Sequence, residues 1–298
     1  MRSILPPNFW REQRDARLNQ REGAAWLYSS QNVRMLKTPN SASCLPLAQE
    51  LYKALRERAT VRPLTVRHPD LTVDDAYAIS LHTLALRCAD GEKVVGKKIG
   101  VTSKAVQDML GVHQPDFGFL TDQMWIEGDI DVDTKRLIAP RAEAEIAFIL
   151  KSPLVGPGIT ADDVLFATES IAPCFEIVDS RIEDWKIGII DTIADNASCG
   201  VFVLGEARAK PSDHDLPSLH VTVTKNGEPL SEGYGSAVQG SPAEAVAWLA
   251  NTLGSYGVAL DAGDVILSGS LVPLAPAEKG DVFEMTLHGI GGCVARFI

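Results

Sequence analysis

The sequence lacks the features that mark several large classes of protein. No apolar run approaches the roughly 18 residues that a membrane-spanning helix needs. The start has no charged-then-apolar pattern with a small-residue cleavage site, so we expect no secretory signal. No GxGxxG or P-loop motif is present to indicate a bound nucleotide. The formal net charge of −11 argues against nucleic-acid binding, because phosphate recognition needs a basic surface.

Cysteine is also scarce. The five cysteines are odd in number, widely spaced and without a CxxC pair. This pattern favours reduced thiols in a cytoplasm over a disulfide framework. No GxSxG nucleophile elbow occurs, and none of the six histidines pairs with another at metal-ligand spacing. The sequence therefore gives no support to a serine hydrolase or to a histidine-based metal site.

The first 43 residues differ from the rest of the chain. They hold seven basic residues against three acidic ones, a net charge of +4 that leaves −15 for the remainder. Apolar periodicity is weak there, which predicts an irregular basic extension at residues 1–43. Three interpretations stay open: a disordered arm, an arm that packs on a partner subunit, or a translation start placed too early, with Met35 as the true start. We favour a loosely ordered arm without a catalytic role.

Residues 44–93 are expected to form a small helical lobe. Apolar residues recur at helical spacing from Leu45 to Arg58. A second helix is predicted to begin after Thr72, whose side chain would cap it, and to end near Ala89.

Residues 94–298 have the sequence pattern of a β-rich domain. Short apolar segments alternate with Gly/Pro turns, and Asn226-Gly227 is a strong two-residue hairpin signal. One helix interrupts the strands, with Ser241 as its cap and its end at Gly254. With 298 residues, 45% of them hydrophobic, the chain can bury a sizeable core. The sequence predicts a mixed α/β (α+β) fold, with a β-rich catalytic domain behind the helical lobe.

Two acidic residues stand out in the segment RAEAEIAFIL, residues 141–150. In a strand, Glu143 and Glu145 share one face, while Ala144, Ile146 and other apolar residues form the opposite face. Two carboxylates held so close repel each other, and a divalent cation with oxygen ligands relieves that repulsion. The alternative is a solvated strand edge with two exposed acids.

Glu176 is a natural third ligand. It lies in another apolar strand, where an acid is rarely tolerated without a partner. Three carboxylates leave positions open for water and substrate oxygens, as catalytic Mg²⁺ sites do. Asp179 and Arg181, which follow in the same segment, are expected to form a local ion pair.

Two further motifs carry weaker signals. In GKKIGVTS, residues 96–103, Lys97 and Lys98 must point in opposite directions if the segment is a strand. An inward lysine beside a metal can bind a carboxylate or transfer a proton, although both lysines could be solvated. The turn QPDFG presents Asp116. His113 beside it could line a pocket, although we favour an ordinary turn residue there.

These residues lie in segments that resemble a known family. The similarity runs from about Leu45 to Ile298, through GKKIGVTSKAVQDMLGVHQPDFGFLTD, PRAEAEIAFIL, PCFEIVDSRIEDWKI, DTIADNASCGVFVLG, SPAEAVAWLANTLG and VILSGSLVPL. The chain resembles the 2-hydroxypenta-2,4-dienoate (2-oxopent-4-enoate) hydratases of aromatic meta-cleavage pathways, in the fumarylacetoacetate hydrolase superfamily. Residues 1–43 fall outside the similarity.

The resemblance implies a function and a set of roles. It implies a hydro-lyase that adds water to 2-hydroxypenta-2,4-dienoate and gives 4-hydroxy-2-oxopentanoate. It places Mg²⁺ or Mn²⁺ on Glu143, Glu145 and Glu176, a proton-transfer pair on Lys98 and Asp116 with Lys97 as the alternative lysine, and a substrate-binding loop near Ser270. It also implies a homo-oligomer, a pentamer or decamer, that can associate with the pathway decarboxylase.

Three alternative functions stay open. A 2-oxo-3-hexenedioate (4-oxalocrotonate) decarboxylase of the same superfamily would use the same metal to stabilise an enolate while CO₂ leaves. A carbon–carbon bond hydrolase would need a general base, often a histidine, to activate water. A non-catalytic subunit would bind a partner enzyme instead, although a full set of ligands argues against lost activity.

Overall fold

A computed structural model of the chain describes residues 41–103, 107, 112–126 and 131–298. The first forty residues of the predicted basic extension lie outside this range. Helix α2 begins at Ser41, so the last three residues of that extension are helical instead of irregular. Among the described residues, no helix combines the length and the apolar character that crossing a membrane requires.

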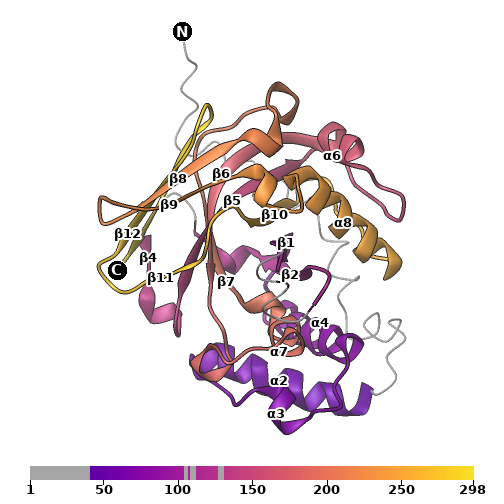
Figure 1. Cartoon of the computed structure of the whole chain (residues 1–298). Helices are drawn as coiled ribbons and strands as arrows, with labels where there is room; N and C mark the ends of the chain where they lie inside the picture. Colours follow the sequence, from indigo (N-terminus) through magenta and orange to yellow (C-terminus); the bar gives the residue numbers. More distant parts are fainter. Residues whose placement is uncertain (1–40, 104–106, 108–111, 127–130) are drawn as a thin grey trace.

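Helices gather at the N-terminal end of the described chain, as expected. They are α2 (Ser41–Glu57), α3 (Leu64–Arg67) and α4 (Val73–Ala89), and α2 packs against α4. Thr72 caps α4 as predicted: its hydroxyl accepts from the Asp75 amide at 3.2 Å, and Asp75 reaches back to the Thr72 amide. The helical region also contacts α7 (Ile189–Ala194), which lies beside it in Figure 1.

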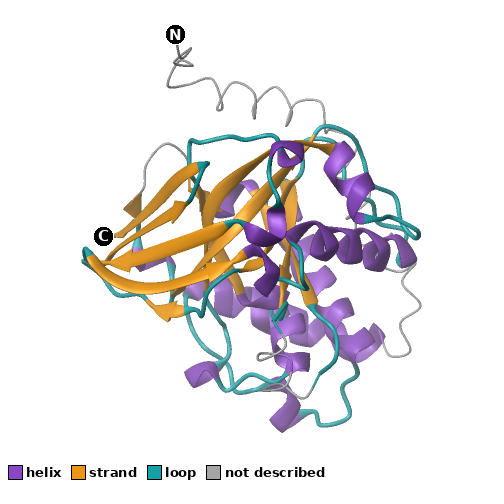
Figure 2. Ribbon diagram, turned by 45° about the horizontal axis from the view of Figure 1, so that its top comes forward, coloured by secondary structure: helices purple, strands orange, loops and turns teal. Residues whose placement is uncertain are grey.

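Strands supply the rest of the frame. An eight-stranded sheet has the order β2-β1-β10-β5-β6-β7-β3, with β11 paired to β5, and a five-stranded sheet has the order β4-β13-β12-β8-β9. Figure 2 shows the strands as one body with helices packed around it. The strand bounds are Val94–Gly100 (β1), Asp116–Thr121 (β2), Trp125–Ile126 (β3), Asp131–Val132 (β4), Arg141–Leu150 (β5), Thr168–Val178 (β6), Cys199–Leu204 (β7), His220–Lys225 (β8), Glu228–Tyr234 (β9), Val265–Ser270 (β10), Ala275–Pro276 (β11), Val282–Leu287 (β12) and Gly291–Phe297 (β13).

Two predicted local signals in this region are confirmed. Asn226-Gly227 joins β8 to β9 with both residues at positive φ, as a tight hairpin requires. Helix α8 (Pro242–Ser255) begins after Ser241, whose hydroxyl accepts from the Ala243 amide at 3.3 Å. Helix α6 (Ala161–Ala167) packs against α8. The predicted α+β fold with an N-terminal helical region is therefore confirmed.

Both faces of the large sheet are buried. One face, which includes Ile146 and Phe148, joins the main apolar cluster with α8 and the small sheet. The other face carries a smaller cluster around Ala147, Leu267 and Phe202. Because β2 also contacts β7, the sheet curls around this smaller cluster. The curl brings together the ends of strands that are distant in sequence. They meet at one open end of the curled sheet, here called the mouth, where the acidic residues lie.

Candidate metal centre

Three glutamates meet where β5 and β6 pair. Glu143 lies directly opposite Glu176 in the antiparallel register, and Glu145 is two residues further along the same face. One carboxylate oxygen from each comes within 4.8 Å of the others, the only such group of possible metal ligands in the described part of the chain. The structure thus brings together all three predicted ligands, while their role as ligands stays a prediction.

The carboxylate oxygens need a partner. Glu145 and Glu176 are fully buried, and Glu143 is partly exposed toward the mouth. The Gly269 amide donates to Glu145 Oε2 at 2.8 Å, whereas Glu145 Oε1 and Glu176 Oε2 accept no hydrogen bond within the described residues, and Glu176 Oε1 is in an ion pair with Lys98 but accepts no hydrogen bond of good geometry there. Buried acceptors left in this state cost free energy unless a cation satisfies them.

The pKa shifts agree with this need. Burial, together with the charge of Glu176, raises the pKa of Glu143 to about 7. Burial and the charges of Glu176 and Glu143 raise the pKa of Glu145 well above its usual value. A divalent cation reverses both effects because it favours the ionised carboxylates. The donor set, all oxygen and all anionic, therefore fits a hard divalent cation.

Lys98 is the lysine that faces the centre. Its Nζ lies 3.2 Å from Glu176 Oε1, and its side chain is almost fully buried. Burial alone would lower the pKa of Lys98, but the charges of Glu176 and Asp116 outweigh it, so the net pKa is raised. Lys97 points to the opposite face of β1, where its Nζ lies 2.5 Å from Asp264 Oδ2. The expectation that the two lysines diverge matches this geometry.

Asp116 opens β2 and pairs in register with Gly100 at the end of β1. Its Oδ2 accepts from the Thr192 hydroxyl at 3.3 Å, while its buried Oδ1 has no hydrogen-bond partner in the described chain. Burial raises the pKa of Asp116, although Lys98 opposes the shift. A Cβ atom at Gly100 would lie 2.3 Å from Asp116 Oδ1 and 3.2 Å from Lys98 Nζ, so glycine is what lets these two side chains approach the strand end.

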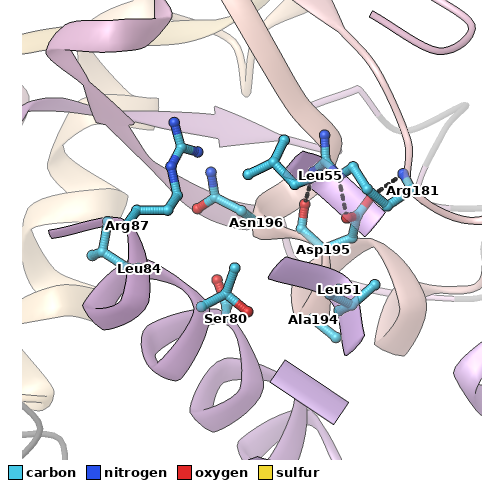
Figure 3. A pocket seen from close by; sticks show the side chains of 10 residues that line it. Leu51, Leu55, Ser80, Leu84, Arg87, Arg181, Ala194, Asp195 and Asn196 are labelled. Carbon is cyan, nitrogen blue, oxygen red and sulfur yellow. Dashed lines mark hydrogen bonds and ion pairs between the residues drawn. The ribbon is translucent and has the colours of Figure 1, made fainter. Parts of the chain in front are cut away.

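The Arg181 ion pair differs from expectation. Arg181 Nε pairs with Asp195 Oδ1 at 2.5 Å, as Figure 3 shows, and not with the Asp179 carboxylate. The Asp179 carboxylate instead accepts from the backbone amides of Ile138 and Ala139. The predicted Asp179–Arg181 pair is therefore wrong, because backbone donors across the sheet take the carboxylate and a helix-end aspartate takes the guanidinium.

Hydroxyl groups connect this buried pair to Asp116. The Ser198 hydroxyl lies 3.3 Å from Asp195 Oδ2 and 3.5 Å from the Thr192 hydroxyl that contacts Asp116. Beyond Asp195, a cavity of about 10 Å³, room for about one water molecule, lies among α2, α4 and α7 (Figure 3). Thr192 and Ser198 were not predicted as site residues, although both lie in the segment DTIADNAS.

Ser270 lies at the edge of the site. Its Cα pairs in register with Glu145 across a bulge in β10, and its hydroxyl donates to the Val272 carbonyl at 2.6 Å. The neighbouring Gly269, at φ +107, supplies the amide that holds Glu145. The SGS turn thus contacts the glutamate triad through a backbone amide, which leaves no side-chain signature in the sequence.

An open cleft of about 460 Å³ lies beside the centre. Thr102 connects the two, because it lines the cleft and packs so closely on Gly269 that a Cβ there would lie 2.6 Å from its hydroxyl. His113, three residues before Asp116 in the sequence, also lines the cleft.

Comparison with known proteins gives a consistent picture. The family model for the C-terminal domain of fumarylacetoacetate (FAA) hydrolase matches residues 101–298. A 2-hydroxyhexa-2,4-dienoate hydratase of Comamonas testosteroni is 63% identical over 84% of this chain and 95% of its own. A 2-hydroxypent-2,4-dienoate hydratase of Pseudomonas putida is 61% identical over 72% of this chain and 96% of its own.

A solved structure agrees in fold over nearly the same length. It is the 4-oxalocrotonate decarboxylase of Pseudomonas putida G7 complexed with magnesium and adipate. That structure is 36% identical to this chain, with a TM-score of 0.83, over 88% of this chain and 99% of its own.

Proposed function

We propose that this chain, which belongs to the fumarylacetoacetate hydrolase family, is a divalent-metal-dependent hydratase that adds water to a 2-hydroxy-2,4-dienoate. The prediction of a hydro-lyase is confirmed by relatives above 60% identity that bear hydratase names. The observation that carries the proposal is the triad of Glu143, Glu145 and Glu176, buried beside Lys98 and Asp116 at one mouth of the curled sheet.

Each residue has a role in this proposal. The three glutamates hold Mg²⁺ or Mn²⁺, which supplies Lewis acidity for the substrate's carboxylate and 2-oxygen. Lys98, kept charged by its acidic neighbours, stabilises negative charge that develops on the 2-oxygen. Asp116, whose raised pKa suits it to hold a proton, moves one from the 2-hydroxyl to C5. The product of that step is a conjugated 3-ene 2-ketone, and water then adds its hydroxyl at C4 and a proton at C3.

The decarboxylase is the second candidate. The solved decarboxylase structure shares this fold at 36% identity, well below the identity of the two hydratases. Enolate stabilisation by the same centre would serve either reaction, so the difference must lie in where protons and water are delivered. We favour the hydratase because the similarity to named hydratases is far higher.

The test is a product analysis of the purified protein. We expect 2-hydroxypenta-2,4-dienoate to be consumed with Mg²⁺ or Mn²⁺ present and 4-hydroxy-2-oxopentanoate to form. A chelator should stop the reaction, and added metal should restore it. Release of CO₂ from 2-oxo-3-hexenedioate, without hydration of the dienoate, would replace this proposal by the decarboxylase.

Other properties are proposed from the family alone. We propose a homo-oligomer, a pentamer or decamer, located in the cytoplasm and able to associate with the pathway decarboxylase. Light scattering of the full chain, alone and mixed with that decarboxylase, measures both assemblies.

A further inference from the structure

Arg141 shares a strand face with two of the three metal-site glutamates. It opens β5, and the register of β5 with β6 is regular from Arg141 opposite Val178 to Ile149 opposite Ser170. Side chains two apart on a regular strand point the same way. Arg141 therefore stands next to Glu143 on the side toward the mouth, as Glu145 stands on the side toward the interior.

The guanidinium of Arg141 rests on an aromatic ring. Its Cζ lies 4.2 Å from the centroid of the Trp185 ring. Trp185 belongs to a short 3₁₀ turn, Glu183–Trp185, that follows β6, and its Nε1 donates to the Ala139 carbonyl at 3.0 Å. The Trp185 ring is thus held by its own backbone, which follows β6, and by its hydrogen bond to Ala139, which precedes β5. A ring held in this way keeps the guanidinium in one orientation.

Among the described residues, nothing accepts a hydrogen bond from this guanidinium. Arg141 is partly buried, yet within the described residues it forms no ion pair and donates no hydrogen bond. The buried Arg181 is fully engaged by comparison, with Asp195 and with carbonyl groups. An arginine offers five N–H donors in a flat fork whose geometry matches a carboxylate.

Charge balance at the mouth calls for another cation. The carboxylates of Glu143, Glu145, Glu176 and Asp116 and the ammonium of Lys98 sum to a formal charge of −3. A divalent cation brings the sum to −1, which still repels an anionic substrate. Arg141 on the same strand face brings it to zero, so an acid can enter without net repulsion.

We propose that Arg141, held flat on Trp185, binds the carboxylate of the substrate at the mouth of the metal centre, in addition to the contact of that carboxylate with the metal. The inference rests on the proposed function, since it names the group that recognises the acid at that same site. It assigns to Arg141 a binding role and to Trp185 the positioning of Arg141.

The experiment measures binding, separately from turnover. Calorimetry measures the affinity of the Mg²⁺-loaded full chain for two ligands. One is 2-oxopentanoate, a saturated 2-oxo acid that cannot be hydrated, and the other is 2-oxopentanamide, which lacks the carboxylate charge. The variants are Arg141→Met, Arg141→Lys and Trp185→Leu. The matched control is Lys279→Met, which removes one positive charge from the exposed turn between β11 and β12.

We expect Arg141→Met to bind 2-oxopentanoate roughly 10- to 100-fold more weakly than the wild type, the range for a lost charge-assisted hydrogen bond. Arg141→Lys should retain part of the affinity, Trp185→Leu should lose part of it, and Lys279→Met should match the wild type. The amide should bind the wild type and Arg141→Met alike, and Mg²⁺ binding should not weaken in Arg141→Met.

Two results overturn the inference. One is equal affinity of Arg141→Met and the wild type for 2-oxopentanoate. The other is a loss that extends equally to the amide or to Mg²⁺, which would make Arg141 a structural residue. Failure of the proposed function looks different: the wild type would bind the 2-oxo acid through Arg141 yet leave the dienoate unreacted.

Discussion

Lys98 Nζ lies 3.2 Å from Glu176 Oε1, while the adjacent Lys97 lies 2.5 Å from Asp264 Oδ2 on the opposite side of the same strand. The same side chain on two adjacent residues thus lies on opposite faces of β1, once beside the glutamate triad and once paired with Asp264. Strand alternation alone produces this division of roles. It also makes the two positions a matched pair for substitution.

Lys98→Met should impair the reaction more than the fold. The change removes the charge that would stabilise the 2-oxygen, so we expect kcat to fall by roughly 10²- to 10⁴-fold. Metal affinity should hold or rise, because the ammonium no longer competes for Glu176. Steady-state kinetics and Mg²⁺ calorimetry on one preparation check both, and weaker Mg²⁺ binding would contradict the assignment.

Lys97→Met should impair the stability of the fold more than the reaction. It leaves the fully buried Asp264 without its closest cation, and breaking a buried ion pair by removing one partner costs about 3–5 kcal/mol. Denaturant unfolding measures that loss. At temperatures where the variant stays folded, kcat should remain near that of the wild type. A large fall in kcat with unchanged stability would assign Lys97 to the reaction instead.

Glu145→Gln tests the metal centre through stability. The neutral amide keeps the shape of the side chain and removes one of the mutually repelling charges. The metal-free variant should therefore melt at or above the temperature of the metal-free wild type. Added Mg²⁺ should raise the melting temperature of the wild type and leave that of the variant nearly unchanged. Equal Mg²⁺ stabilisation of both proteins would exclude Glu145 as a ligand.

Metal binding should strengthen as pH rises. The pKa of Glu143 in the metal-free protein is raised to about 7, so below that pH the metal must displace a proton. Mg²⁺ affinity should climb as Glu143 loses its proton up to about pH 7, and should keep rising while Glu145, whose pKa is also raised well above its usual value, loses its own. The stability of the metal-free protein should fall over the same interval, because the folded state holds a proton that the unfolded state has lost. Calorimetry across this pH series checks the first slope and thermal melts the second.

Thr192→Val should perturb Asp116 specifically. The Thr192 hydroxyl lowers the pKa of Asp116 against the raising effect of burial, so its loss should move the matching limb of the pH–rate profile to higher pH. Thr192→Ser keeps the donor and should keep the wild-type profile. Identical profiles in all three proteins would remove Thr192 from the proton path.

Whether an interaction could be predicted from the sequence depends on how far apart its partners lie along the chain. Glu143 and Glu145 were predictable from alternation over three residues, and Thr72 from a capping pattern of similar length. The same alternation includes Arg141, but an arginine at a strand start resembles an ordinary surface charge until Trp185, 44 positions later, is placed beneath it.

Contacts between residues that are distant in the sequence could not be predicted from it. Thr192 lies 76 residues from Asp116, and Asp264 lies 167 residues from Lys97. The Asp179–Arg181 prediction failed for the same reason. Proximity in sequence suggested the pair, whereas the folded chain offers Asp179 two backbone amides and offers Arg181 the carboxylate of Asp195. The role of Gly269 was hidden because a backbone amide leaves no side-chain signature.

The strand order has a consequence for biosynthesis. β10 lies between β1 and β5 in the large sheet, although it is the last of the three to be synthesised. Glu143 and Glu176 can face each other once the β5–β6 hairpin leaves the ribosome, but Lys98 reaches them only after β10 has inserted. A nascent chain that stops before β10 therefore carries the cluster of acids without the Gly269 amide and without the strand that places Lys98 beside it. The full geometry of the candidate metal centre is thus available only once β10 has been synthesised and has paired with its neighbours.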